Sequence, residues 1–263
     1  MNKRIRNKFL TKSKKLITFV TAGDPDINTS LKIMKNLPIY GSDIIELGMP
    51  FSDPMADGPT IQMSSQRAIK NNVDLNKIFY MAKQFRKNNK TTPIILMGYY
   101  NPIYNYGNKK FINKCAESGI DGLIIVDLQP EFDQELYNLS SKKNIEFIRL
   151  ITPTTNNTRL NNILPKAGGF LYYVSITGIT GQNSANLNTL KKSIKELKIR
   201  TKIPICVGFG IKSPKQAGLI SKFVDGVIVG SSIVKIIEKN SSKKIIIKKI
   251  NNFVNSLSKA INK

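Results

Sequence analysis

The sequence predicts an α/β fold: a (β/α)8 TIM barrel with an added N-terminal helix, in a single domain over residues 1–263. Eight short segments rich in Ile, Val and Leu alternate with helical segments, which is typical of a parallel sheet covered by helices. The length of 263 residues fits one large barrel. Polar and glycine-rich clusters follow the strand-like segments, where barrel active sites lie. A doubly wound open sheet is the alternative, but no G-x-G-x-x-G motif follows the first strand.

The strand-like segments are short apolar runs that end at glycine, proline or a polar residue. They cover residues 16–22, 43–47, 94–97, 122–126, 146–150, 170–174, 203–207 and 225–229. The helical segments between them cover residues 28–37, 60–70, 75–88, 109–117, 131–142, 156–164, 187–197 and 213–222. An amphipathic segment over residues 3–14 precedes the first strand, so we expect it to be the added helix. A stripe of apolar residues from Ile246 to Leu257 predicts a last outer helix.

The chain is strongly basic, with 41 Lys and Arg against 17 Asp and Glu and a net charge of +24. The basic residues are scattered along the chain, and no aromatic-rich nucleic-acid motif accompanies them. We therefore expect no specific nucleic-acid binding, only weak and salt-sensitive contacts with polyanions. The heavy use of Lys, Asn and Ile, whose codons are A/T-rich, indicates drift in base composition as the origin of this charge.

Residue types that are rare or absent limit the kinds of catalytic and metal site that the chain can form. The chain has no His, which excludes serine–histidine and cysteine–histidine catalysis. Its two cysteines, Cys115 and Cys206, are too few for a disulfide framework, and a zinc site is nearly excluded. Acid–base work must therefore fall to carboxylates, Tyr, Lys or Cys. No apolar run approaches the roughly eighteen residues of a membrane helix, so we expect no membrane association and a cytoplasmic location.

The stretch from residue 43 to 59 carries the best candidates for catalysis. A buried strand places Glu46 among apolar neighbours, and the Gly- and Pro-rich loop after it carries Asp57. Burial would raise the pKa of Glu46 towards working pH, while a wetter Asp57 stays ionised, and such a pair suits acid–base chemistry. The alternative is a structural Glu paired with a donor from the loop, because structural pairs also have perturbed pKa values.

Three glycine clusters in the last barrel loops predict a phosphate site: Thr180-Gly181, Gly208-Phe209-Gly210 and Gly230-Ser231. Glycine lets backbone N–H groups approach an anion, and a helix N-terminus adds attraction, although each cluster alone could be an ordinary turn. The strand ends also carry four aromatic residues, which could form a flat apolar pocket. They are Phe19, Tyr99, Tyr100 and Tyr172. Together these features indicate a planar substrate with a phosphorylated tail.

Lysine occurs within the strand-end loops only at Lys212, so a Schiff-base aldolase is weakly supported. No motif for a nucleotide, a flavin or a metal is present in the sequence. We therefore expect no cofactor and no metal.

Five motifs resemble those of the tryptophan synthase alpha subunit family. The most specific is ELGMPFSDPMADGP over residues 46–59. The others are MGYYNP at 97–102, S-x-x-G-x-T-G at 175–181, VGFGI at 207–211 and GSSIV at 230–234. They occur in the order of the family and span residues from about 16 to 237. After Asp127 the chain reads Leu-Gln-Pro-Glu-Phe, where the family more often has Leu-Pro followed by paired acids, so the detail of this loop departs from the family.

The resemblance implies a lyase of tryptophan biosynthesis that cleaves indole-3-glycerol phosphate to indole and glyceraldehyde 3-phosphate by a retro-aldol reaction. It implies no cofactor, and a tryptophan synthase beta subunit as partner in an α2β2 heterotetramer. In this reading Glu46 is the general acid–base, and Asp57 stabilises the positive charge that develops at the indole nitrogen.

The resemblance also implies the substrate-binding residues. Phe19, Tyr99 and Ile124 would line the indole pocket, and Tyr172 would lie beside Glu46. Thr180 and Gly181 would belong to a closing loop. The phosphate would be bound by Gly210, Gly230 and Ser231.

Two functions of other classes compete with the lyase. The chain could serve mainly as a binding module that activates the beta subunit, but Glu46 and Asp57 are both intact, which favours catalysis. It could also bind nucleic acid through its charge alone, in which case the affinity should vanish by about 0.2 M salt.

Overall fold

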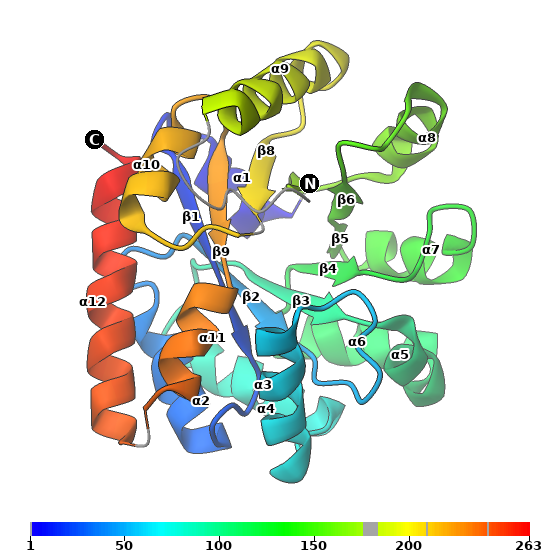
Figure 1. Ribbon diagram of the computed structural model, residues 1–263. Helices are drawn as coiled ribbons and strands as arrows, with labels where there is room; N and C mark the ends of the chain where they lie inside the picture. The colour runs from blue at the N-terminus through cyan, green and yellow to red at the C-terminus, as the bar shows by residue number, and fades with distance from the viewer. Residues whose placement is uncertain (1, 176–183, 209, 241) are drawn as a thin grey trace.

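The computed structural model describes residues 2–175, 184–208, 210–240 and 242–263. Within these ranges, parallel strands form one sheet in the order β5-β4-β3-β2-β1-β9-β8-β7-β6, which curls into a barrel (Figure 1). The strands are β1 (Lys15–Thr21), β2 (Ile44–Gly48), β3 (Ile94–Gly98), β4 (Gly122–Ile125), β5 (Glu146–Phe147), β6 (Arg149–Ile151), β7 (Leu171–Val174), β8 (Ile205–Gly208) and β9 (Gly226–Val229).

The predicted strand 146–150 is divided into β5 and β6, which are the two ends of the sheet order. β5 pairs only with β4, and β6 pairs only with β7, within the described ranges. Ile148 lies between them and donates its N–H to the carbonyl of Leu123 on β4, at 2.9 Å. The break therefore marks the stagger between neighbouring strands that barrel closure requires. Counting β5 and β6 as one strand, the prediction of an eight-stranded barrel is confirmed, and the open doubly wound sheet is wrong.

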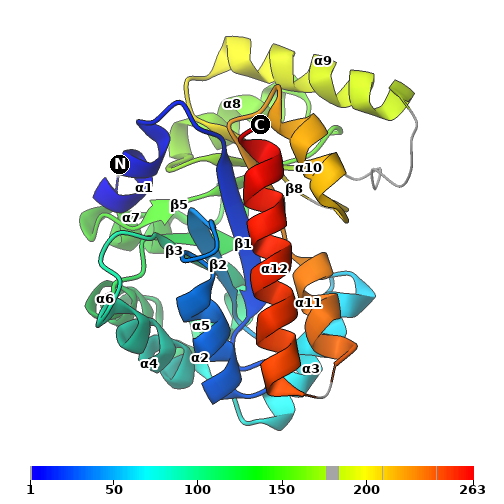
Figure 2. The ribbon, with the colours of Figure 1, turned by 90° about the vertical axis from the view of Figure 1, so that its left-hand side faces the viewer.

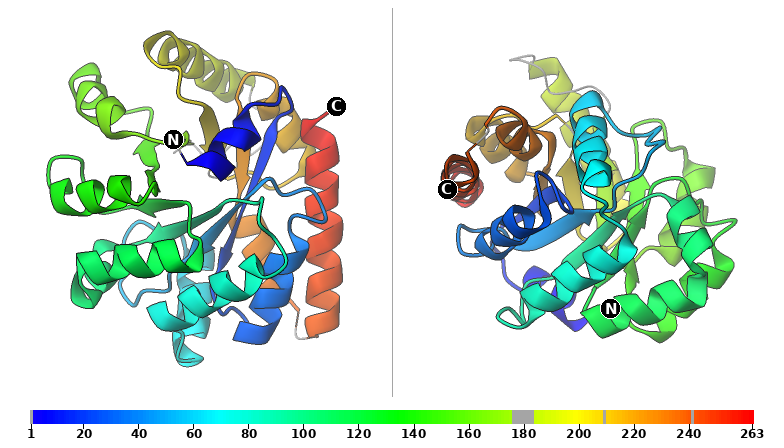
Figure 3. Two further views of the ribbon diagram at one scale, coloured as in Figure 1. Left: turned by 180° about the vertical axis from the view of Figure 1, so that it is seen from behind. Right: turned by 90° about the horizontal axis from the view of Figure 1, so that it is seen from below.

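Helices form the outer layer of the barrel (Figure 3). Before β4 they are α1 (Lys3–Phe9), α2 (Ile27–Asn36), α3 (Pro59–Lys70), α4 (Leu75–Arg86), α5 (Tyr100–Tyr106) and α6 (Asn108–Ser118). After β4 they are α7 (Gln134–Lys142), α8 (Asn157–Ile163), the 3-10 turn η1 (Leu164–Lys166), α9 (Ser184–Arg200), α10 (Pro214–Ser221), α11 (Ser231–Glu238) and α12 (Lys243–Ile261). The last helix, α12, packs along the outside against α2, α10 and α11 (Figure 2). No helix within the described ranges is long and apolar enough to cross a membrane.

Besides shifts of a few residues at other helix ends, two helices differ from the sequence prediction. The added helix α1 ends at Phe9, although the amphipathic pattern predicted residues 3–14. Helix α5 lies outside the predicted helical segments, because a proline shortly after a strand segment indicates only that the strand does not continue. Pro102 is the third residue of α5, and in a first turn its missing N–H has no helical partner to lose.

Buried apolar side chains form two clusters, one inside the barrel and one between the strands and the outer helices. Residues of a strand alternate between them: on β1, Ile17 lies inside, whereas Leu16 and Val20 face the helices. Ile5 of α1 is fully buried in the inner cluster. Helix α1 thus covers the end of the barrel at which the strands begin (Figure 3, left).

A buried carboxylate holds α1 to the barrel. Asp121 is fully buried, and its two oxygens accept from Arg4 of α1 at 2.5 Å and from Arg86 of α4 at 2.7 Å. It also accepts from the backbone N–H of Ile94, at 2.8 Å. A single carboxylate therefore pairs with two guanidinium groups from different helices.

Replacing Asp121 with Asn should lower the free energy of unfolding by about 3–5 kcal/mol, because it leaves the buried Arg86 without its counter-charge. Urea unfolding followed by circular dichroism measures this loss. Glu117→Gln is the matched control, since Glu117 pairs with lysines at the surface and its side chain is 51% exposed. An Asp121→Asn protein as stable as this control would contradict the structural role of Asp121.

Candidate active site

A cavity of about 430 Å³ opens at the end of the barrel where the strands finish. The side chains that line it come from strands around the barrel and from the loops that follow them. The inward-pointing strand residues are Phe19 (β1), Glu46 (β2), Met97 (β3), Leu150 (β6), Tyr172 and Val174 (β7) and Ile228 (β9). The residues that follow the strands include Asp57, Gly58 and Pro59 after β2, Gly210 and Ile211 after β8, and Gly230 after β9. The cavity therefore lies where barrel enzymes carry their active sites.

Glu46 is the unusual group in this cavity. Its side chain is fully buried on β2, and neither carboxylate oxygen has a hydrogen-bond partner among the residues that the structure describes. Burial raises the pKa of Glu46 from 4.5 to about 8, because the apolar surroundings disfavour the charged form. The alternative for Glu46 is a structural glutamate that accepts a hydrogen bond from a donor in the loop. Two unpaired oxygens do not match this alternative. Glu46 is thus a carboxylic acid that holds its proton near neutral pH and lies at a cavity wall.

Tyr172 lies near Glu46 and is itself buried. Burial raises the pKa of its hydroxyl, and the nearby carboxylates of Glu46 and Asp57 raise it further. Gly208 makes room for this ring: a Cβ at position 208 would lie 2.5 Å from the Tyr172 hydroxyl oxygen. The ring is therefore a neutral wall of the cavity.

Asp57 is held by Tyr99. The Tyr99 hydroxyl donates to Asp57 Oδ2 at 3.1 Å and accepts from the backbone N–H of Ala56 at 3.0 Å. Asp57 is more exposed than Glu46, as expected, but partial burial still raises its pKa, and the bond from Tyr99 opposes this shift. Burial also raises the pKa of Tyr99, so that its hydroxyl remains a donor. Tyr99 thus orients the carboxylate that faces the cavity.

The phosphate-binding residues predicted from the late glycine clusters lie at one side of the same cavity. Gly210 has a positive φ of 82°, a conformation that favours glycine, and Gly230 immediately precedes the first residue of α11, Ser231. The N-terminus of α11 therefore points its partial positive charge at the cavity. Lys235, one helical turn after Ser231, also lines the cavity. This side of the cavity is suited to an anionic group.

The structure places the remaining predicted site residues as follows. Phe19 lines the cavity, whereas Tyr99 lies beside it and, with Phe19 and Asp57, lines a small adjoining pocket of about 20 Å³. Ile124 is fully buried in the inner cluster and is not among the lining residues. Thr180 and Gly181 lie outside the described residues.

Sequence reasoning missed several lining residues. The apolar ones include Met97, Val126, Leu150, Val174, Ile211 and Ile228. Alternation along the strands could have indicated some of them, since Leu150 follows the inward-facing Ile148 by two residues. Lys235 lies in a helix rather than in a strand-end loop, and only its spacing from Ser231 could have indicated it, because residues four apart share a helix face.

Comparison with known proteins places the chain in context. A family model described as tryptophan synthase alpha chain matches residues 6–262. The chain is similar to the crystal structure of tryptophan synthase subunit alpha from Legionella pneumophila str. Paris, with 39% identity, a TM-score of 0.92, and coverage of 99% of this chain and 98% of that chain. A structure from Aquifex aeolicus VF5 is 36% identical, with a TM-score of 0.90 and coverage of 100% of both chains. Tryptophan synthase from M. tuberculosis in its aminoacrylate-bound form is 27% identical, with a TM-score of 0.87, and the match covers 98% of this chain and 99% of that chain.

Proposed function

Because the chain belongs to the tryptophan synthase alpha chain family, we propose that it cleaves indole-3-glycerol phosphate to indole and glyceraldehyde 3-phosphate, as a step of tryptophan biosynthesis. The observation that carries this proposal is Glu46, a buried carboxyl with two unpaired oxygens and a pKa of about 8 at the cavity wall. Such a group can donate a proton near neutral pH to a carbon atom of a bound ring.

The proposed reaction uses Glu46 twice. Its carboxylic acid first protonates the indole ring carbon that bears the glycerol chain, which leaves a positive charge on the indole nitrogen. The resulting carboxylate then accepts the proton of the hydroxyl on the adjacent chain carbon. As that oxygen forms an aldehyde, the bond between the ring and the chain breaks, and its electron pair restores the aromatic indole. Glu46 ends protonated, as it began, and no other reactant is consumed.

Asp57 and the α11 side of the cavity have supporting roles in this proposal. The Asp57 carboxylate, oriented by Tyr99, faces the indole N–H and stabilises the charge that develops there. The phosphate lies at Gly210, Gly230 and Ser231, where the helix N-terminus attracts it. Phe19 and Tyr172 pack against the ring.

We propose a tryptophan synthase beta subunit as partner, in an α2β2 complex. Three large apolar side chains are exposed on consecutive segments after β2, β3 and β4. They are Met55 (81% exposed), Tyr104 (66%) and Phe132 (77%). Strands β2, β3 and β4 are neighbours in the sheet, so the three side chains follow strands at the same end of the barrel, and exposed apolar groups there are typical of a protein interface. The two cysteines are free and buried, in keeping with the proposed cytoplasmic location.

The test is indole release from indole-3-glycerol phosphate, measured with and without the beta subunit. Release by the isolated chain that increases with the partner would support both the reaction and the complex. An inert chain that still stimulates the beta subunit would replace this proposal with the binding-module function.

Lys235→Gln should raise KM for indole-3-glycerol phosphate by about tenfold and leave kcat nearly unchanged, because the phosphate is remote from the reacting carbon and binds equally in ground and transition states. Steady-state kinetics measures both constants. Lys239→Gln is the matched control, since it removes the same charge just past the end of the same helix and away from the cavity. Equal effects of the two variants would contradict a contact between Lys235 and the phosphate.

A further inference from the structure

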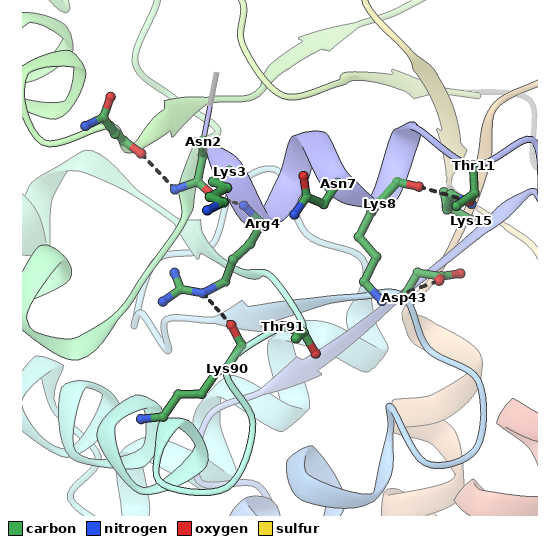
Figure 4. Close-up of a pocket in the computed structure, with 11 residues that line it drawn as sticks. Asn2, Lys3, Arg4, Asn7, Lys8, Thr11, Lys15, Asp43, Lys90 and Thr91 are labelled. Atoms are coloured by element: carbon green, nitrogen blue, oxygen red, sulfur yellow. Dashed lines mark hydrogen bonds and ion pairs between the residues drawn. The ribbon is translucent and has the colours of Figure 1, made fainter.

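A second and larger cavity, of about 990 Å³, lies beside α1 (Figure 4), at the end of the barrel where the strands begin. Its lining residues belong to α1 and to the segments that lead into β1, β2, β3 and β5. They are Asn2, Lys3, Arg4, Asn7, Lys8, Thr11, Lys15, Asp43, Lys90, Thr91 and Asn144. We call this cavity the α1 groove. The proposed reaction uses none of these residues.

The α1 groove carries a surplus of positive charge. Five of its described lining side chains are cationic, and Asp43 is the one carboxylate among them, although Arg4 also pairs with the buried Asp121 behind the lining. Lys8 reaches from α1 towards Asp43, but their closest atoms are 3.7 Å apart (Figure 4). Lys3 and Lys90 have no carboxylate partner in the part of the chain that the structure describes. Charge that is left unpaired in a concave site favours an anionic ligand.

Lys15 adds a buried cation to this groove. Only 2% of the residue is exposed, and its ammonium donates to the Thr11 hydroxyl at 2.7 Å and to the Ser13 hydroxyl at 2.6 Å. It also donates to the Ser13 carbonyl, at 2.5 Å. These acceptors are all neutral, and Asp43, whose charge acts on Lys15 from a distance, forms no ion pair with it within the described structure. An anion in the groove would supply the missing counter-charge.

The side chains that line the α1 groove determine which kind of anion it can bind. Lysine, arginine, asparagine and threonine side chains all donate hydrogen bonds to phosphate oxygens. No aromatic side chain of the described residues lines the groove, so these residues offer no surface on which a nucleic-acid base could stack. We propose that the α1 groove binds a condensed phosphate chain of di- or triphosphate length, independently of the candidate active site at the other end of the barrel.

The test is isothermal titration calorimetry at low ionic strength, where charge interactions are least screened, with tripolyphosphate and, separately, with magnesium-free ATP. The variant Lys3→Gln/Lys8→Gln should weaken binding of tripolyphosphate by about tenfold. The matched control is Lys244→Gln/Lys248→Gln on α12, which removes the same charge from two exposed lysines away from the groove. It should bind within about twofold of the wild type.

The outcomes distinguish binding in the α1 groove from attraction by net charge and from binding in the other cavity. Equal weakening by the two double variants would overturn the proposal, because attraction would then follow net charge alone. No binding to the wild type would overturn it as well. Loss of binding in Ser231→Asp would also overturn it, because the anion would then lie at the α11 side of the other cavity. Tripolyphosphate and ATP binding alike would support recognition of the phosphate chain itself, and tighter ATP binding would identify a nucleotide as its source.

Discussion

Replacing Glu46 with Gln should lower the rate of indole release by about 10²–10⁴-fold, the usual contribution of a positioned acid–base group. The amide keeps the shape of the side chain but can neither donate the proton to the ring carbon nor accept one from the hydroxyl. Single-turnover measurements with saturating substrate report the chemical step directly. Glu117→Gln, at an exposed position, should retain wild-type activity. A Glu46→Gln enzyme with near-normal turnover would remove Glu46 from the mechanism.

The same variant should change how stability depends on pH. Burial raises the pKa of Glu46 from 4.5 to about 8, so between these values the unfolded chain releases a proton that the folded chain retains. The free energy of unfolding of the wild type should therefore decrease as pH rises through this window, by at most about 4–5 kcal/mol. Glu46→Gln lacks this loss, so its stability relative to the wild type should increase with pH. Wild-type activity should fall above about pH 8 as the acid form is lost.

Urea unfolding of both proteins across this pH range checks the prediction, and circular dichroism before unfolding shows whether both are folded. A constant difference in stability between the two proteins from acid to alkaline pH would contradict a raised pKa at Glu46. In that case the folded protein would carry an ionised carboxylate in the cavity at neutral pH.

Asp57→Asn should lower kcat by about 10²–10³-fold, the usual effect of removing one electrostatic contact to a developing charge. The amide still fills the site beside Tyr99 but carries no negative charge to stabilise the positive indole nitrogen. KM should change little, since the neutral ground state of the indole needs no counter-charge. Steady-state and single-turnover kinetics with indole-3-glycerol phosphate separate these effects.

Two further variants sharpen this test. Asp53→Asn removes a carboxylate from the exposed part of the same loop and should have wild-type kinetics. Tyr99→Phe removes the hydroxyl that orients Asp57, so it should lower kcat less than Asp57→Asn does. An Asp57→Asn enzyme that loses substrate affinity rather than turnover would assign Asp57 to binding instead of charge stabilisation.

Much of the architecture was determined by the sequence. The alternation of apolar strand segments with helical segments is visible in the sequence, without knowing which segments become neighbours in space. This alternation predicted the parallel barrel, and an amphipathic pattern predicted the N-terminal helix. Local signals failed at Ile148 and Pro102. The break at Ile148 depends on the stagger between strands β4 and β7. A proline stops a strand from continuing but also fits the first turn of a helix, so the local sequence at Pro102 does not distinguish the two.

The candidate site was likewise determined in part by the sequence and in part by the tertiary structure. The motif at 46–59 identified Glu46 and Asp57, and the glycines after β8 and β9 indicated where an anion would lie. Only the tertiary structure shows that both oxygens of Glu46 are unpaired among the described residues, that Tyr99 bonds Asp57, and that Lys235 lines the cavity. Only the tertiary structure shows the α1 groove, because its residues come from α1 and from loops that are far apart in the sequence. Residue type and spacing determine which groups a strand or helix presents, but burial and hydrogen bonds between groups far apart in sequence arise when the barrel closes.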